Sequence, residues 1–175
     1  MAETVKPYSE EGSKKGQVSK MFNSIAPYYD FLNHLLSGGI DIIWRKKAIS
    51  LLKKSKPSSI LDVATGTADL AITAHKMLQP EKITGVDIST KMLEVGRKKI
   101  KKRELSDTIT LEEGSAENLP YEDNTFDAIT VAFGVRNFED LNKGLAEMYR
   151  VLKPDGSLVV LEFSKPKVFP LKQIF

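Results

Sequence analysis

Apolar residues recur along the chain with two different periods, and the change from one to the other falls near Pro57. Before Pro57 they return every three to four positions, which predicts amphipathic helices over residues 17–29, 30–36 and 40–53. A Ser-Gly-Gly sequence at 37–39 predicts a break between the second and third helices. Five apolar residues of the third helix are expected to face inward: Ile43, Trp44, Ala48, Leu51 and Leu52. Residues 1–16 are polar and predict a mobile tail.

After Pro57, short apolar runs alternate with helical patterns. Strands are predicted over 59–64, 82–87, 108–112, 127–133 and 157–163, and helices over 67–78, 89–104 and 140–152. Ser89 and Asp140 are the expected N-caps, and Pro154-Asp155-Gly156 predicts a turn before the last strand. The last helix should turn one apolar face inward: Leu141, Leu145, Met148, Tyr149 and Leu152. This alternation predicts an α/β fold with a mostly parallel sheet and helices on both faces.

The most informative segment is Ile60 to Asp69, where an apolar strand runs into a glycine turn and then a helix. Asp87 ends the next strand, 21 positions after Gly66 (87 − 66), a spacing that suits a nucleotide ribose at the ends of two parallel strands. The loop has one glycine, and Asp62 and Asp69 flank it, so it would repel phosphate. S-adenosylmethionine, which has no phosphate and carries positive charge, therefore fits better than a dinucleotide such as NAD. A strand-turn-helix that binds nothing is the remaining alternative.

Composition and charge exclude several classes of protein. A length of 175 residues suits one domain, and a net charge of +3 is too small to indicate nucleic-acid binding. Without cysteine the chain can form no disulfide or cysteine–zinc site, which is typical of a cytoplasmic protein. No apolar run reaches the ~20 residues that span a bilayer, so any membrane contact should be peripheral. The basic run at 97–103 is interpreted as a solvated helix face, with attraction to an anionic membrane surface as the alternative.

Three segments, 29–44, 132–137 and 150–164, resemble the menaquinone/ubiquinone biosynthesis C-methyltransferases. The resemblance implies a Rossmann-like class I methyltransferase, with an N-terminal helical lid at 17–56 and a cofactor-binding core at 57–175. Five positions depart from the family pattern: Leu32 stands for the usual Met, Asp41 for His, Ala68 and Asp155 for Gly, and Ala132 for the Ser of some members. Members normally have two further strands after the fifth. We therefore expect a C-terminally truncated chain whose last strand is an exposed edge through which it self-associates.

The resemblance implies S-adenosylmethionine as cofactor, bound by Asp62, Gly66, Thr67, Asp87, Ser115 and Ala116. A carboxylate offers two oxygens, so Asp87 can accept both ribose hydroxyls. Gly66 would let the backbone approach the methionine end closely. For Thr67, a helix N-cap is the alternative interpretation.

The implied substrate is a polyprenylated quinol, most concretely demethylmenaquinol; the alternatives are the ubiquinone-branch benzoquinol, or a fragment that binds cofactor without turnover. Arg136 is expected to stabilise the phenolate and Asn137 to orient the ring oxygen. Tyr29 and Asn33 are expected to form part of the lid. The alternatives are a salt bridge of Arg136 with Glu139 or Asp140, and simple helix packing for Tyr29 and Asn33. With only two histidines, no metal site is expected.

Overall fold

A five-stranded parallel sheet forms the centre of the protein, as described by a computed structural model for residues 12–163, the side chain of His34 excepted. The strands are β1 (Ser59–Val63), β2 (Lys82–Asp87), β3 (Ile109–Glu113), β4 (Phe126–Ala132) and β5 (Leu152–Leu161). Their order in the sheet is β3-β2-β1-β4-β5, and every neighbouring pair is parallel. The predicted fold class is therefore confirmed.

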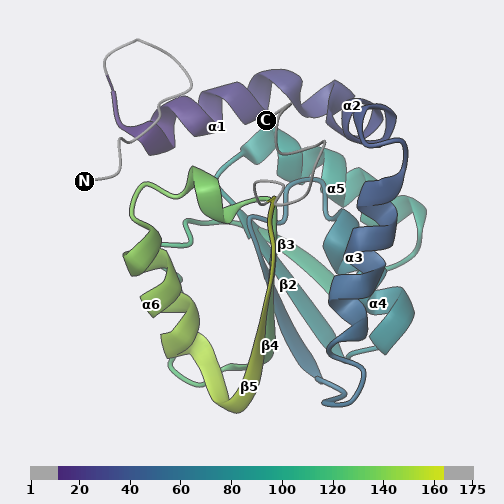
Figure 1. Ribbon diagram of the computed structural model, residues 1–175, viewed down its shortest axis with the longest axis vertical. Coiled ribbons are helices and arrows are strands. Elements are labelled where there is room, and N and C mark those ends of the chain that lie inside the picture. The colour runs from purple at the N-terminus through teal and green to yellow at the C-terminus, as the bar shows by residue number, and fades with distance from the viewer. Residues whose placement is uncertain (1–11, 164–175) are drawn as a thin grey trace, which may run out of the picture.

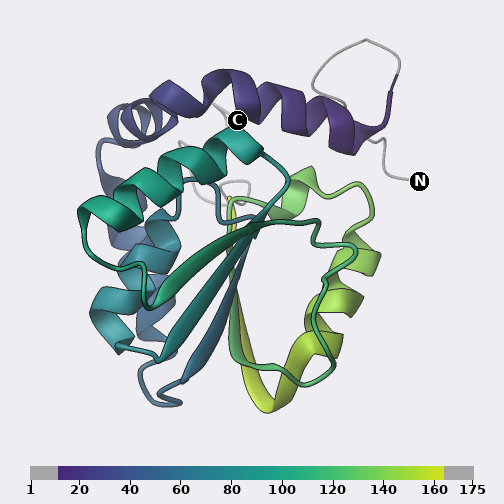
Figure 2. The same cartoon turned by 180° about the vertical axis from the view of Figure 1, so that it is seen from behind.

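Helices cover both faces of this sheet and one of its ends. They are α1 (Lys14–Ile25), the 3-10 turn η1 (Ala26–Tyr28), α2 (Tyr29–Leu36), α3 (Ile40–Ser50), α4 (Asp69–Leu78), α5 (Thr90–Lys102), the 3-10 turn η2 (Val135–Asn137) and α6 (Leu141–Val151). In Figure 1, α3, α4 and α5 lie on one side of the sheet and α6 on the other. Figures 1 and 2 show α1 and α2 crossing the end where the strands finish. Of the segment predicted as a lid, α1 and α2 lie over this end of the sheet, whereas α3 packs beside α4.

Helix α1 begins at Lys14 rather than at residue 17, because Ser13 is an effective N-cap whose Oγ accepts from the Gly16 N–H. The predicted tail is therefore wrong for residues 14–16, while residues 1–11 lie outside the described range. Two hydrogen bonds fix α1 over the strand ends. The Ser19 hydroxyl donates to the Ile88 carbonyl, 3.0 Å away, and the Ser89 hydroxyl donates to Asn23 Oδ1, 2.9 Å away.

The predicted inward face of α3 is correct for Ala48 and Leu52 and wrong for its other three residues. Ile43 is 64% exposed and Trp44 37%, and Leu51 lies beyond the end of the helix with 69% exposure. The buried stripe is instead Asp41, Arg45, Ala48, Ile49 and Leu52. Its members keep helical spacing, but two of them are charged. A search for apolar periodicity passes over such a stripe.

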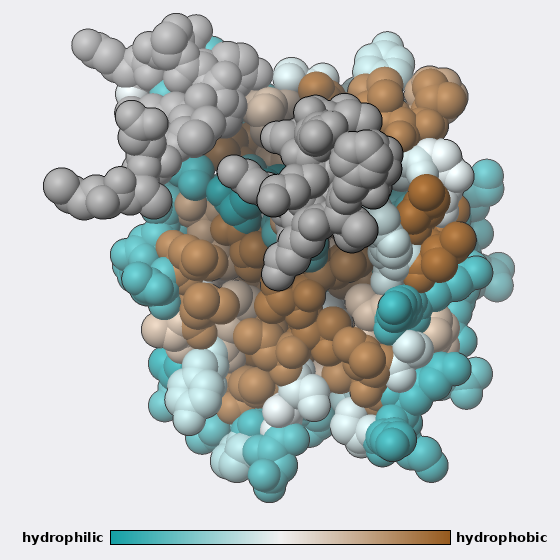
Figure 3. All heavy atoms as spheres, in the orientation of Figure 1, coloured by the Kyte–Doolittle hydropathy of each residue, from teal (hydrophilic) through white to brown (hydrophobic). Residues whose placement is uncertain are grey.

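The predicted inward face of α6 is also wrong in part. Met148 and Val151 are buried beside Gly144, whereas Leu141, Leu145 and Tyr149 are exposed. A Cβ on Gly144 would lie 2.6 Å from the ring of Phe138, so close packing of this ring sets which side of α6 faces the core. The exposed leucines contribute to an apolar surface over β5 and α6 that is brown in Figure 3.

Strand β5 begins at Leu152, five residues before the predicted start at 157. The expected turn is present as an irregularity inside the strand: Phe126 pairs with Leu152 and Ala128 with Ser157, so three extra residues (5 − 2) bulge out of β5. Asp155 there has a φ of 65°, a left-handed conformation that Asp tolerates better than most residues. Asp155 is thus compatible with a position where glycine is usual.

Candidate functional site

The loop between β1 and α4 is held in a conformation that most side chains avoid. Ala64, Gly66 and Ala68 have φ of 53°, 55° and 67°. A Cβ on Gly66 would meet nothing within 4 Å, so the backbone there borders open space. Left-handed alanines are costly, and such strain collects at ligand sites. The positive φ of Ala68 also gives a physical reason why glycine is frequent at that position.

Asp87 connects this loop to the end of β2. Its Oδ2 accepts from the Gly66 N–H and its Oδ1 from the Ser89 N–H, both at 2.8 Å. Burial raises the pKa of this carboxyl, and the backbone N–H groups of Ser89, Gly66 and Ile88 oppose that rise. A carboxylate has about four lone-pair sites, so Asp87 keeps acceptor capacity for a ligand.

Three adjoining cavities open around the loop, and Tyr29 lines all of them. Of the predicted site residues, the strand-end cavity is lined by Tyr29, Gly66, Asp87, Ser115, Ala116 and Asn137. The loop cavity is lined by Tyr29, Asp62, Gly66 and Thr67. The apolar cavity, of about 440 Å³, is lined by Tyr29, Asn33 and Arg136 together with Leu36, Ile40, Trp44, Phe133 and Phe163. Arg136 and Asn137 are adjacent in sequence but line different cavities.

Asp62 is a buried carboxylate at the wall of the loop cavity, with only 1% exposure. The Thr65 hydroxyl donates to its Oδ2 at 2.6 Å, and the Thr130 hydroxyl donates to its Oδ1 at 2.7 Å. Burial outweighs these two bonds and raises its pKa from 3.8 to about 6. At neutral pH Asp62 is therefore mostly ionised, although its burial disfavours the charged form.

We expect Asp62→Asn to raise the free energy of unfolding by about 1–2 kcal/mol at pH 7.5 without ligand. The folded pKa of Asp62 lies above its ordinary value, so ionisation costs stability above about pH 6, and the cost fades as the pH falls toward 3.8. The threonine hydroxyls can rotate to suit an amide. Urea denaturation at pH 7.5 and at pH 4.5 measures the gain, which should shrink at the lower pH. A gain of equal size at both pH values would contradict this explanation.

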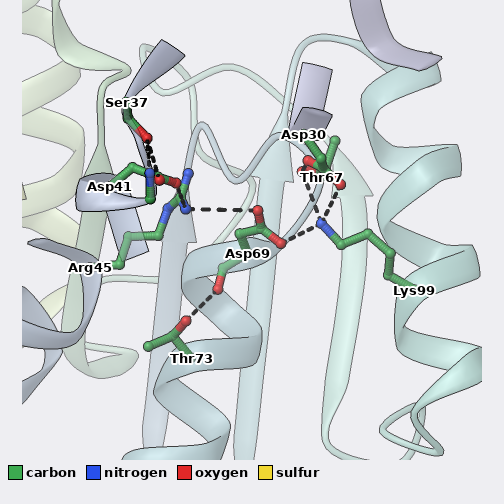
Figure 4. Close-up of polar contacts among 9 residues, drawn as sticks. Asp30, Ser37, Asp41, Arg45, Thr67, Asp69, Thr73 and Lys99 are labelled. Atoms are coloured by element: carbon green, nitrogen blue, oxygen red, sulfur yellow. Dashed lines mark hydrogen bonds and ion pairs between the residues drawn. The ribbon is translucent and has the colours of Figure 1, made fainter. Parts of the chain in front are cut away.

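Lys99 of α5 connects the loop between β1 and α4 to helices α2 and α4. Its Nζ lies 2.8 Å from Asp30 Oδ2 of α2 and 3.2 Å from Thr67 Oγ1, and it pairs with Asp69 Oδ1. The Thr67 hydroxyl donates to Asp30 Oδ1 at 2.5 Å. Figure 4 shows Lys99 reaching from α5 to these three residues.

This cluster corrects three interpretations of the sequence. Lys99 is only 16% exposed, so the solvated-face interpretation of the basic run fails there. Thr67 does not cap α4, whose N-cap is Ala68. Asp69, expected to repel phosphate, is instead paired with Lys99 and lies 3.8 Å from Arg45.

Lys99→Met is expected to lower the free energy of unfolding by about 1–2 kcal/mol, because it removes a cation that two partly buried carboxylates share. Lys98→Met is the matched control: Lys98 is the exposed neighbour in the same helix, and its loss should change stability little. Chemical denaturation of both variants provides the comparison. Equal stability of the two variants would show that the cluster is energetically neutral.

Arg136 is half exposed and pairs with Glu162, 2.9 Å away, rather than with Glu139 or Asp140. Its guanidinium carbon lies 5.2 Å from the centre of the Phe163 ring. Both contacts hold it at the apolar cavity. Tyr29 lines the same cavity. Burial raises the pKa of its hydroxyl, which remains a hydrogen-bond donor at neutral pH.

Sequence reasoning missed Asp41 and Arg45, a buried ion pair four residues apart in α3. The Ser37 hydroxyl donates to Asp41 Oδ1 at 2.6 Å. Both charged residues line the apolar cavity, and Arg45 also lines the loop cavity. Opposite charges at i and i+4 were the available signal, but such pairs are usually exposed.

Comparison with known proteins agrees with this geometry. Residues 10–175 match the ubiE/COQ5 methyltransferase family. The chain belongs to this family. A ubiE/COQ5 relative, the demethylmenaquinone methyltransferase of Bacteroides fragilis, is 58% identical over 173 residues, which are 99% of this chain and 71% of the relative. The demethylmenaquinone methyltransferase of Porphyromonas gingivalis is 47% identical over 98% of this chain and 70% of its own length.

Solved structures place this ubiE/COQ5 chain among proteins with the same fold. The [4+2]-cyclase SpnF superposes with a TM-score of 0.75 at 23% identity, over 90% of this chain and 62% of SpnF. A putative S-adenosyl-L-methionine-dependent methyltransferase of Methanococcus maripaludis gives 0.65 at 25% identity, over 89% of this chain and 66% of its own. The chain thus spans slightly less than two thirds of either solved protein. The resemblance predicted from the three sequence segments is confirmed.

Proposed function

We propose that the protein catalyses S-adenosylmethionine-dependent C-methylation of a polyprenylated quinol, with demethylmenaquinol as substrate and menaquinol as product. The observation that carries the proposal is the junction of a strand-end cavity, which holds Asp87, with a second, mainly apolar cavity that holds Arg136. A nucleoside fits the first and an isoprenoid quinol the second. The names of the relatives from Bacteroides and Porphyromonas support this substrate.

The residues of the strand-end and loop cavities suit S-adenosylmethionine. Asp87 has two acceptor positions for the ribose hydroxyls, and the open backbone at Gly66 permits close approach. Ser115 and Ala116 line the part of the cavity assigned to the adenine. Asp62 and Thr67 line the loop cavity, which we assign to the amino-acid end. When bound, the cofactor supplies an electrophilic methyl group.

The residues around the apolar cavity suit activation of a quinol. A ring carbon becomes nucleophilic when the neighbouring hydroxyl loses its proton, and Arg136 provides a positive charge that stabilises the resulting phenolate. Asn137 and Tyr29 provide hydrogen-bonding groups on the strand-end side of the same junction. Arg136 remains charged at neutral pH and cannot itself accept the proton.

Two measurements test the proposal. Calorimetric titration should detect binding of S-adenosylmethionine and S-adenosylhomocysteine and no binding of NAD. A methylation assay with demethylmenaquinol and with the ubiquinone-branch benzoquinol should show transfer to the first. Binding of NAD with comparable affinity would overturn the cofactor assignment, and preference for the benzoquinol would overturn the substrate assignment.

The proposal includes two contacts of the protein with its surroundings: one with a membrane surface and one with a second copy of the chain. Within residues 12–163, no helix is long and apolar enough to cross a membrane. Helix α2 exposes Phe31, Leu35 and Leu36, and Leu36 also lines the apolar cavity, which favours peripheral contact with the membrane that holds the quinol.

Strand β5 lies at the sheet edge with Val160 46% exposed, which favours self-association through that edge. Vesicle flotation and light scattering test the two contacts.

A further inference from the structure

The loop cavity has a cation in its wall that the proposed function does not yet use. Arg45 comes from α3 and is 7% exposed. The other charged residues that line this cavity are Asp62 and Asp69. The cavity therefore combines two carboxylates with one guanidinium, the pattern that complements a zwitterion.

Only part of the Arg45 guanidinium is occupied. Nη1 pairs with Asp41 and lies 3.8 Å from Asp69 Oδ2. Among the residues that the structure describes, Nε and Nη2 donate to no protein acceptor. A guanidinium has five N–H donors, and buried donors normally find partners. Arg45 thus retains donors for a ligand, while Asp41 holds the side chain in position (Figure 4).

The position of Arg45 indicates which ligand group it would meet. The loop cavity and the strand-end cavity share Tyr29, Ala64, Gly66, Ala132 and Phe133, so they adjoin each other at these residues. A nucleoside at Asp87 leaves its other end to extend past Gly66 into the loop cavity. Resting on the function proposed above, we infer that Arg45 binds the α-carboxylate at the amino-acid end of the cofactor, with Asp62 facing the α-ammonium group.

A quinol oxygen is the competing partner, because Arg45 also lines the apolar cavity. The carboxylate is favoured on charge. A carboxylate carries a full negative charge and matches the planar fork of a guanidinium with two parallel hydrogen bonds, whereas a quinol offers a single oxygen that is charged only after it loses its proton.

The test compares two ligands that differ at the amino-acid end. S-adenosylhomocysteine has this end, and 5′-methylthioadenosine has the same nucleoside and thioether without it. Calorimetry should show that Arg45→Gln weakens S-adenosylhomocysteine roughly 10–100-fold, the range for a hydrogen bond to a charged group. Binding of 5′-methylthioadenosine should stay within about twofold, since the nucleoside contacts remain.

Controls separate this role from a structural one. Lys46→Gln removes an exposed cation next along α3 and should change neither affinity. The double variant Asp41→Asn/Arg45→Gln removes both charges of the buried ion pair together and should show the same ligand-selective loss. Decarboxylated S-adenosylmethionine, which keeps the ammonium group, should bind the wild type and Arg45→Gln equally.

Three outcomes would overturn the inference. Unchanged binding of S-adenosylhomocysteine by Arg45→Gln removes the residue from the site. An equal loss for both ligands makes its role structural. Unchanged cofactor affinity with a raised KM for the quinol assigns the guanidinium to the substrate. If the wild type bound neither S-adenosylhomocysteine nor 5′-methylthioadenosine, the proposed function itself would fail first.

Discussion

Arg136→Ala is expected to lower the turnover number for quinol methylation about 10²–10³-fold, the loss typical when one donor to a developing oxyanion is removed. Arg136 lines the apolar cavity, its charge suits a phenolate, and Glu162 with the Phe163 ring holds it there. The affinity for S-adenosylhomocysteine should barely change, because Arg136 does not line the strand-end or the loop cavity. Steady-state kinetics and calorimetry on the same preparation measure both quantities.

Glu162→Gln is the matched variant for this experiment. It removes the charge of the partner and keeps the guanidinium, so it should reduce turnover much less than Arg136→Ala does. Parallel collapse of turnover and cofactor affinity in Arg136→Ala would instead show that the ion pair with Glu162 is needed to shape the site as a whole.

Asp87→Ala is expected to weaken cofactor binding by about 1.5–3 kcal/mol, the range for hydrogen bonds to a charged group. The carboxylate has two roles: it holds the Gly66 and Ser89 N–H groups, and it keeps acceptor positions for a ribose. Glu113→Ala is the control, because Glu113 is the exposed residue paired with Asp87 on the neighbouring strand. Calorimetry should show a loss for Asp87→Ala alone. Equal affinities of the two variants would remove Asp87 from the site.

The strands and the crossover helices were predictable because both signals are local. Alternating apolar runs fix the strands, and the Ser89 and Asp140 side chains cap their helices as expected, accepting from the Met92 and Lys143 N–H groups. Gly66 and Asp87 are brought together by the parallel pairing of β1 with β2, which follows from the same alternation.

Long-range electrostatics were not predictable in this way. Apolar periodicity assigns a charged residue to the surface, so it gave no sign that Asp41 and Arg45 are buried, and it placed Lys99 on a solvated face. Arg45 and Lys99 approach Asp69 and Asp30 on other elements, which no local pattern reveals. The division of Arg136 and Asn137 between two cavities also depends on the η2 turn, which begins after Gly134 against Ala64 and ends before Phe138 against Gly144.

The fluorescence of Trp44 should show whether the apolar cavity is occupied. It is the single tryptophan of the chain, it lines that cavity, and its ring lies edge-on to Phe163 at 5.7 Å. It lines neither of the two cavities assigned to the cofactor. Intrinsic fluorescence should therefore be quenched when a quinone enters and change little when S-adenosylhomocysteine binds, so the signal reports the filling of the apolar cavity alone.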